Sequence, residues 1–336
     1  MVDAINAAQA LSEIGYLLRQ EPKEVFRAKA FAMASWALAL QRPDLDELHR
    51  AGKLTSIEGV GEGIAKVLAD LIYTGASRYL NRLREQMGQP ARDDESVLDL
   101  ALYQGDVHSH TKWSDGRATM LEMAAGAGEL GYRYLGITDH SPRIKVVHGL
   151  DAERLVAQSL EMAEVQQQVE GVTLLQGIEV DILEDGSLDL PDAVLEILDV
   201  VIASPHVKLR QEAAAMTDRM LRAVSHPHVD VIGHPTGRRP GSREGASYDV
   251  EAVFKEAARH GVALEIDCDP ARMDLSPELA RLALECGCNF SIDADAHAPA
   301  EFAYVPMGIW MARRAGIPRE RILNFMTGDE LTHALA

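Results

Sequence analysis

Histidine and carboxylate side chains gather in one short segment of this sequence, residues 105–116, which reads GDVHSHTKWSDG. His108, His110 and Asp115 fall within eight positions there, at the end of a predicted short strand. Residues at i and i+2 of a strand point to the same face, so His108 and His110 are expected to lie side by side. Imidazole and carboxylate groups suit zinc, manganese or iron. The segment therefore predicts part of a metal centre.

The same residue types recur at the ends of later apolar runs. Asp295 and His297 repeat the i, i+2 spacing, and single candidates end four other runs. A lone histidine at a strand end is commonly structural, but here six of the twelve histidines occupy such positions. Nine candidates exceed the ligands of one ion, so two or three divalent ions are expected. The candidates beyond the first segment are His140, Glu179, His206, His234, Asp295 and His297.

Short β-branched runs alternate with amphipathic helices from residue 104 onward, which indicates repeated β-α units and a parallel sheet. Seven such runs are present, and helical patterns over 118–130, 151–169, 248–260 and 276–286 separate them. Seven consecutive units favour a closed or nearly closed α/β barrel, and the glycine fingerprint of a dinucleotide-binding fold is missing. In a parallel barrel the C-terminal strand ends face one rim. The nine candidate ligands are therefore expected at a single mouth.

The first part of the chain has a different pattern. Apolar residues over 1–88 recur at helical spacing, with no strand-like alternation. The segment GQPARDDES that follows is polar and charged, which is typical of a linker. We therefore expect a small all-helical domain over 1–88, a linker over 89–103 and the barrel over 104–336.

Charge and cysteine content narrow the functional classes. The net charge is −19, of which residues 1–95 hold −2 and the remainder −17, so strong non-specific binding of nucleic acid is not expected. Three cysteines cannot form a disulfide framework, and we expect them to pack as buried apolar residues in a reducing cytoplasm. The apolar run over 31–40 is half as long as the roughly 20 residues of a membrane span, and no signal peptide is evident. We expect a cytoplasmic protein without a membrane partner.

Six motifs resemble the successive motifs of the PHP (polymerase and histidinol phosphatase) phosphoesterase family, and in particular the PHP domain of bacterial family X DNA polymerases. The resemblance extends over nearly all of residues 104–326. It implies a distorted seven-stranded, TIM-like (β/α)7 barrel with a trinuclear zinc or manganese site. The motifs are HSHTKWSDG, GITDHS, GIEVDILEDGSLDLPD, IASPHV, GHPTGR and SIDADAH.

The resemblance also implies a role for each ligand. One ion would be held by His108, His110, Glu179 and Asp295. Glu179 would bridge to a second ion held by His206 and His234, and a third ion would be held by Asp115, His140 and His297. The chemistry implied is phosphoester hydrolysis by a metal-bound water, whose pKa the paired ions lower towards neutrality.

Three arginines lie near the predicted mouth. Arg238 comes four residues after a ligand, Arg272 follows the sixth strand, and Arg143 follows His140 in a loop. Their positive charge would hold the phosphoryl oxygens of a substrate, and the alternative for each is a solvated surface charge.

The helical part resembles the helix-hairpin-helix domain of the same polymerases. The hairpin Gly59-Val60-Gly61 would leave backbone N–H groups free at a helix start to hold a DNA phosphate, with Lys66 nearby. The polymerase catalytic domain is absent, which excludes nucleotide transfer. Val67 occupies the position of the lysine nucleophile of lyase-active relatives, so we expect no lyase activity. The alternative is a helical scaffold that binds no DNA.

Three functions remain open. The favoured one is processing of DNA ends, as a 3′-5′ exonuclease or terminal phosphatase in repair, with DNA bound by the N-terminal domain. The second is a phosphomonoesterase for a small phosphorylated substrate, such as a histidinol-phosphatase, which the acidic barrel favours. A non-catalytic repair scaffold is the third, and the complete ligand set argues against it.

Overall fold

The computed structural model describes residues 2–86 and 98–335. Within these residues, seven strands and eight α-helices form the larger body, and five α-helices precede it. The strands are β1 (Gly105–Asp106), β2 (Tyr134–Ile137), β3 (Thr173–Asp181), β4 (Val200–Ser204), β5 (Val231–Ile232), β6 (Ala263–Asp267) and β7 (Phe290–Asp293). The helices around them are α6 (Met120–Glu129), α7 (Ala152–Gln166), α8 (Asp192–Leu195), α9 (Ala213–Val224), α10 (Val250–His260), α11 (Pro277–Glu285), α12 (Val305–Ala315) and α13 (Gly328–Leu335).

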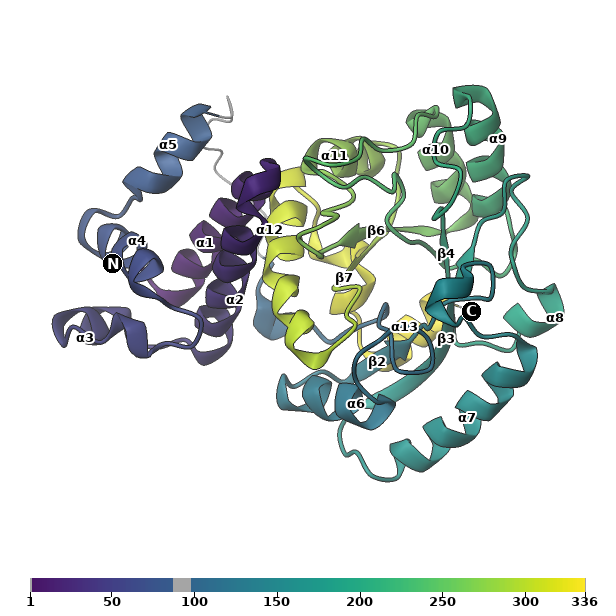
Figure 1. Ribbon diagram of the computed structural model, residues 1–336, viewed down its shortest axis with the longest axis horizontal. Helices are drawn as coiled ribbons and strands as arrows, with labels where there is room; N and C mark the ends of the chain where they lie inside the picture. Colours follow the sequence, from purple (N-terminus) through teal and green to yellow (C-terminus); the bar gives the residue numbers. More distant parts are fainter. Residues whose placement is uncertain (1, 87–97, 336) are drawn as a thin grey trace.

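All seven strands are parallel and neighbour one another in chain order, from β1 to β7. Helices surround the strands in Figure 1, as the alternating pattern predicts. The strands are almost entirely buried on both faces, which explains their continuous apolar sequences. This arrangement confirms the predicted seven-stranded, nearly closed barrel.

Buried carboxylates complete the seam between β7 and β1, where only an isolated bridge pairs the described strands. The backbone N–H of Val107 donates to Asp293 Oδ1 at 2.8 Å, and the N–H of Ala294 donates to Asp106 Oδ2 at 2.8 Å. Asn324 Nδ2 also donates to Asp293 Oδ1, at 2.8 Å. Burial and the neighbouring charge of Asp293 raise the pKa of Asp106 well above its usual range. Side chains thus supply part of the hydrogen bonding at the seam, beside the backbone bond from the His110 N–H to the Ala296 carbonyl oxygen.

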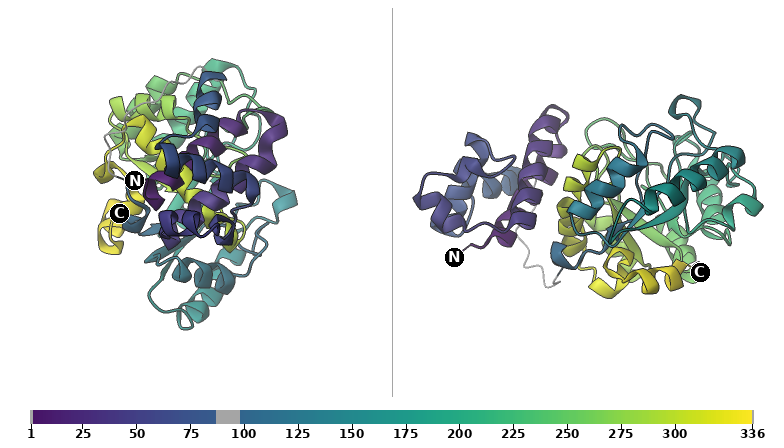
Figure 2. Two further views of the ribbon diagram at one scale, coloured as in Figure 1. Left: turned by 90° about the vertical axis from the view of Figure 1, so that its left-hand side faces the viewer. Right: turned by 90° about the horizontal axis from the view of Figure 1, so that it is seen from below.

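The N-terminal helices form a second lobe beside the barrel (Figure 2). In Figure 1, the first two of them lie between the barrel and the other three. These helices are α1 (Ala4–Arg19), α2 (Val25–Gln41), α3 (Leu45–Arg50), α4 (Glu62–Thr74) and α5 (Arg78–Gln86). Asp3 caps α1 and Asp44 caps α3 by accepting backbone N–H groups, as these residue types commonly do.

Helix α1 packs directly on the barrel helix α12. The rings of Tyr16 and Trp310 lie 4.8 Å apart, and Gly15 is so close to α12 that an added Cβ would lie 2.9 Å from Met307 Cε. Arg19, at the end of α1, is buried and donates to the carbonyl oxygen of Pro240 at 2.8 Å. The helical lobe is therefore joined to the barrel by both apolar packing and a buried hydrogen bond.

Other predictions concern the linker, the membrane and the cysteines. Most of the predicted linker lies outside the described residues, and Leu100–Leu102 form a single 3-10 turn. No helix in the described part of the chain combines the length and apolar character that crossing a membrane requires. Cys268 and Cys288 are buried free thiols, and Cys286 is a partly exposed free thiol.

Candidate metal centre

Glu179 lies at the centre of the predicted ligands. It is buried on β3, and its carboxylate oxygens face imidazoles from four other strand ends. Glu179 Oε1 is 2.8 Å from His234 Nε2, 3.1 Å from His206 Nε2 and 3.5 Å from His108 Nε2. Glu179 Oε2 is 2.7 Å from His140 Nδ1. A single carboxylate therefore touches residues that follow β1, β2, β4 and β5.

The remaining predicted ligands adjoin this group. His110 Nε2 lies 2.9 Å from Asp295 Oδ1. Asp115 Oδ1 lies 3.3 Å from His297 Nε2 and 3.6 Å from His140 Nε2. The structure thus brings all nine residues to one mouth, because the C-terminal ends of parallel strands share a rim.

The polar atoms of this cluster are better placed to bind cations than to form hydrogen bonds with one another. Three subsets each offer ligand atoms within 4.8 Å of one another. Several buried atoms, including His108 Nε2, both ring nitrogens of His110, His206 Nε2 and Glu179 Oε2, have no partner with hydrogen-bond geometry in the described residues. Buried polar atoms without partners are costly, and divalent ions would satisfy them. The donor set therefore fits zinc or manganese. The three subsets are His110, Asp115, His140 and His297; His108, His110 and Asp295; and His140, Glu179 and His206.

Two further carboxylates contact the Nδ1 atoms of candidate ligands, on the side of each ring that faces away from Glu179. Glu265 Oε1 lies 2.6 Å from His108 Nδ1, and Asp181 Oδ1 lies 3.2 Å from His206 Nδ1. Each contact directs the opposite ring nitrogen, Nε2, towards Glu179. Such partners fix the tautomer and orientation of metal-binding histidines.

Sequence reasoning missed both supporting carboxylates: Asp181 lies on β3, two residues after Glu179, and Glu265 lies on β6, to which no metal ligand was assigned. Glu265 and Asp267 in the segment EIDCD have the same i, i+2 spacing as the predicted ligands. That alternation of acidic residues within a buried strand was the available signal.

The protonation of each histidine in the cluster depends on its burial and on the charges beside it. Burial and nearby positive charges hold the pKa of His110 at about 3, and burial with the charge of Arg272 does the same for His234, so both rings are neutral near pH 7. Burial alone would lower the pKa of His206, but the charge of Glu179 raises it to about 9. Likewise, Asp115 raises the pKa of His297 to about 9 against the effect of burial. Without a cation, the cluster therefore carries protons that bound ions would displace.

Two of the candidate ligands have a left-handed backbone. His234 has φ of 28° and Asp295 has φ of 48°, values that residues other than glycine seldom adopt. His234 is held there by its N–H, which donates to Glu265 Oε2 at 2.5 Å. Strained backbone supported in this way is common at functional sites.

The three predicted phosphate-binding arginines lie in different surroundings. Arg272 is buried, with its Nε 3.2 Å from Asp295 Oδ2 and 3.3 Å from Asp267 Oδ2. Arg238 is half-buried, and its Nη2 has no hydrogen-bond partner in the described residues. Arg143 is exposed, with its Nη2 2.7 Å from Glu184 Oε1. Arg272 thus contacts the ligand cluster, whereas Arg143 points to another surface carboxylate.

The predicted hairpin lies in the helical lobe, on the side of α1 and α2 away from the barrel (Figure 1). Gly59 has φ of 74°, and Gly61 is the N-cap residue of α4 and has no side chain to cap it, so the backbone N–H groups at this helix start have no side-chain partner within the described residues. Val60 is buried, so only its backbone can meet a ligand. Lys66 is exposed and Val67 is buried.

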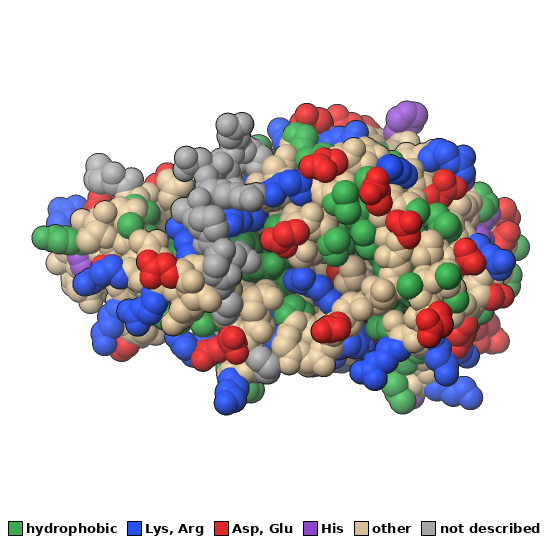
Figure 3. All heavy atoms as spheres, turned by 90° about the horizontal axis from the view of Figure 1, so that it is seen from above, with side chains coloured by type: hydrophobic (Ala, Val, Ile, Leu, Met, Phe, Trp, Pro, Cys, Tyr) green, Lys and Arg blue, Asp and Glu red, His purple; other side chains and the backbone are tan. Residues whose placement is uncertain are grey.

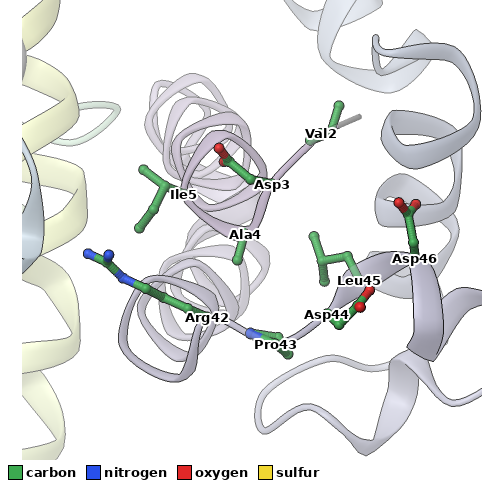
Figure 4. A pocket seen from close by; sticks show the side chains of 9 residues that line it. All are labelled: Val2, Asp3, Ala4, Ile5, Arg42, Pro43, Asp44, Leu45 and Asp46. Carbon is green, nitrogen blue, oxygen red and sulfur yellow. The ribbon is translucent and has the colours of Figure 1, made fainter.

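A hollow of about 440 Å³ lies in the helical lobe, between the start of α1 and the segment that joins α2 to α3 (Figure 4). Its carboxylates are largely engaged: Asp3 and Asp44 cap helices. Arg42, which also lines it, pairs with Asp99 at 2.7 Å. Nothing in this hollow resembles the ligand cluster of the barrel.

A parallel α/β barrel with this histidine and carboxylate cluster at its C-terminal rim defines a metal-dependent hydrolase. The sequence model of the PHP domain matches residues 106–268. A "probable phosphatase" of Thermoanaerobacter sp. (strain X514) is 30% identical over 235 residues, which cover 66% of this chain and 91% of that protein. The chain therefore belongs to the PHP family and is a metal-dependent phosphoesterase.

Two further comparisons are with a longer relative and with a solved structure. The DNA polymerase/3′-5′ exonuclease PolX of Bacillus subtilis is 38% identical over 232 residues, which cover 69% of this chain but only 41% of that protein. The crystal structure of a histidinol phosphate phosphatase from Lactococcus lactis superposes with a TM-score of 0.45 at 12% identity, over 64% of this chain and 95% of that one. A likeness of that size supports no inference about this chain.

Proposed function

We propose that this chain hydrolyses phosphoester bonds at DNA ends, as a 3′-5′ exonuclease or a terminal phosphatase. The observation that carries the hydrolytic part is the gathering of Glu179 and eight other histidine and carboxylate side chains at one mouth, with buried nitrogens that lack hydrogen-bond partners within the described residues. The proposal includes the division into a helical domain over 1–88 and a barrel over 104–336, joined by a linker over 89–103.

In this proposal the cluster holds two to three zinc or manganese ions, and all nine predicted ligands take part. His108, His110, Glu179 and Asp295 would hold the first ion, His206 and His234 would hold the second together with Glu179, and Asp115, His140 and His297 would hold the third. Ions bound there would supply an activated water and would neutralise charge on the phosphoryl oxygens.

The side chains of the protein set the conditions for that chemistry. Glu265 and Asp181 keep the imidazoles of His108 and His206 oriented. Arg272 places a buried positive charge beside Asp295 and Asp267, and we propose that it helps to hold a phosphoryl oxygen of the substrate. Arg238, whose Nε donates to the Arg272 carbonyl oxygen at 3.4 Å and whose Nη2 has no hydrogen-bond partner within the described residues, is the second arginine of this proposal. The reaction requires no side-chain nucleophile.

The choice of DNA rests on two observations. The relative named as a DNA polymerase and 3′-5′ exonuclease matches 69% of this chain at 38% identity. In addition, the uncapped start of α4 at Gly61 offers backbone donors to a phosphate, and Lys66 is exposed on the same helix.

A small phosphomonoester is the second candidate, and the acidity of the barrel favours it. On the face seen in Figure 3, acidic and basic side chains are interspersed over the barrel rather than gathered into a basic band. A relative named "probable phosphatase" also matches over nearly its whole length. Histidinol phosphate serves as the test substrate of this class.

One comparison of substrates tests the proposal. Metal-stripped protein is reloaded with Mn²⁺ or Zn²⁺ and given single-stranded, recessed and 3′-phosphorylated DNA, beside histidinol phosphate. A His110→Ala variant lacks a proposed ligand, and a His260→Ala variant, changed at the surface end of α10, is its matched control. We expect metal-dependent shortening or dephosphorylation of DNA, lost only in His110→Ala. Turnover of histidinol phosphate with DNA untouched would reverse the ranking, and inactivity on every substrate would favour a scaffold.

A further inference from the structure

A second pocket adjoins the candidate metal centre. It has a volume of about 570 Å³, and the loops that follow β1 and β2 form its walls. The first wall includes Lys112 and Trp113, and the second includes Lys145 and His148. Arg154, at the start of α7, completes the lining.

The pocket is positive within an acidic barrel. Lys112, Lys145 and Arg154 contribute three positive charges, and no acidic residue lines it in the described part of the chain. Lys112 Nζ lies 4.0 Å from Glu122 Oε2, but both side chains are exposed, so this pair is weak. The ammonium of exposed Lys145 makes no ion pair with residues 2–86 or 98–335. Two lysine charges are thus available to a ligand.

The walls of the pocket are held in place before any ligand binds. Arg154 Nη1 donates to the carbonyl oxygens of His148 and, at 2.9 Å, Gly149, and its Nη2 donates to that of Trp113 at 2.5 Å. The same guanidinium lies 5.6 Å from the centroid of the Trp113 ring, and Trp113 Nε1 donates to Glu161 Oε2 at 2.8 Å. Arg154 therefore links both loops, and the binding charges are left to the lysines.

Both walls lead directly into the ligand cluster. Lys112 and Trp113 shortly precede Asp115, and the second loop starts immediately after His140. Asp115 Oδ1 and His140 Nε2 lie 3.6 Å apart. An anion in the pocket would therefore sit beside the metal centre rather than in it.

We propose that this pocket binds the phosphodiester next to the one that is cleaved, and so selects polynucleotide substrates over small monoesters. The proposal rests on the proposed hydrolysis of DNA ends. Lysine charges suit a phosphate, and the partly exposed Trp113 ring offers an apolar surface to the adjoining nucleoside. A small monoester has no second phosphate, so the pocket contributes nothing to its binding.

A Lys112→Gln/Lys145→Gln double variant tests this inference. It is compared with Lys255→Gln, which removes an exposed lysine on α10. A 3′-end-labelled single-stranded oligonucleotide and p-nitrophenyl phosphate are the two substrates, and thermal unfolding confirms that the variants fold. We expect the double variant to raise KM for the oligonucleotide about tenfold, with kcat/KM for p-nitrophenyl phosphate changed less than twofold. The slope of log KM against log salt should fall by about 0.7 per lost phosphate contact.

The outcomes separate this inference from the proposed function. If the wild-type protein cleaves the oligonucleotide and the double variant has the same KM and salt slope, the pocket does not bind the second phosphate. If the wild-type protein cleaves only p-nitrophenyl phosphate, the proposed action on DNA fails and the inference fails with it. If either Lys112→Gln or Lys145→Gln unfolds the protein, the other single variant is used instead, and its KM and salt slope decide whether the pocket binds the second phosphate.

Discussion

Replacing Glu265 by glutamine tests whether the orientation of His108 matters for metal binding, because His108 itself is left unchanged. Glu265 is buried on β6, with its Oε1 2.6 Å from His108 Nδ1 and its Oε2 accepting the N–H of His234 at 2.5 Å. It therefore supports two candidate ligands of different ions. Burial raises its pKa to about 7, against the charge of His108. A bound cation would favour the ionised carboxylate, because its positive charge would lie nearby and would strengthen the His108 Nδ1–H as a donor to Glu265.

The expected effect follows from the nature of the contact. Glutamine has nearly the same shape and can still accept one N–H, so the fold should survive. Loss of the charged partner of a metal-binding histidine typically weakens metal affinity 10–100-fold, or about 1.4–2.8 kcal/mol. We expect a loss in this range for Mn²⁺.

Calorimetric titration of metal-stripped protein with Mn²⁺ measures this loss directly. A Glu251→Gln variant, changed at an exposed carboxylate on α10, is the matched control. Urea unfolding of both metal-free variants establishes that they are folded. An Mn²⁺ affinity of Glu265→Gln within twofold of the wild type would refute the assigned role of Glu265 in orienting His108.

Three further predictions concern stability in the metal-free protein, each measured by urea unfolding. Burial raises the pKa of Asp230 to about 7, so the folded protein loses stability as pH rises from about 4 to 7 and this buried carboxyl ionises. The free energy of unfolding of Asp230→Asn should therefore rise relative to that of the wild type by about 2 kcal/mol between pH 5 and pH 8. A difference between the two proteins that does not depend on pH would contradict this. Arg19→Met removes the donor to the Pro240 carbonyl and should cost about 1–3 kcal/mol, whereas an unchanged midpoint would show that the two lobes do not depend on it. Gly136→Ala would place a Cβ 2.5 Å from the carbonyl oxygen of Val107, just after β1, and should cost about 1–3 kcal/mol; Gly63→Ala on α4, whose Cβ meets nothing within 4 Å, is a control that should lose no stability.

Local patterns in the sequence were enough to predict the barrel and the residues at its mouth. Alternation of β-branched runs with amphipathic helices indicates parallel strands, and parallel strands place their C-terminal ends on one rim. His110 and His297 are 187 residues apart in the chain, yet each ends a predicted strand, and their ring centroids lie 4.3 Å apart, as that topology requires. The metal-binding role of the cluster stays a prediction, whereas its assembly around Glu179 is observed.

Tertiary structure decided the features that depend on contacts between distant side chains. The sequence does not reveal which groups these side chains contact: Glu265 contacts His108, Asp106 and Asp293 meet backbone N–H groups at the seam of the barrel, and Arg19 meets the Pro240 carbonyl. A buried acid in a strand has the same sequence pattern whether it orients a ligand, closes a seam or binds a cation. Only the register of the strands and the packing of α1 on the barrel determine which group each side chain meets, because hydrogen bonds act over about 3 Å and periodicity specifies only a face.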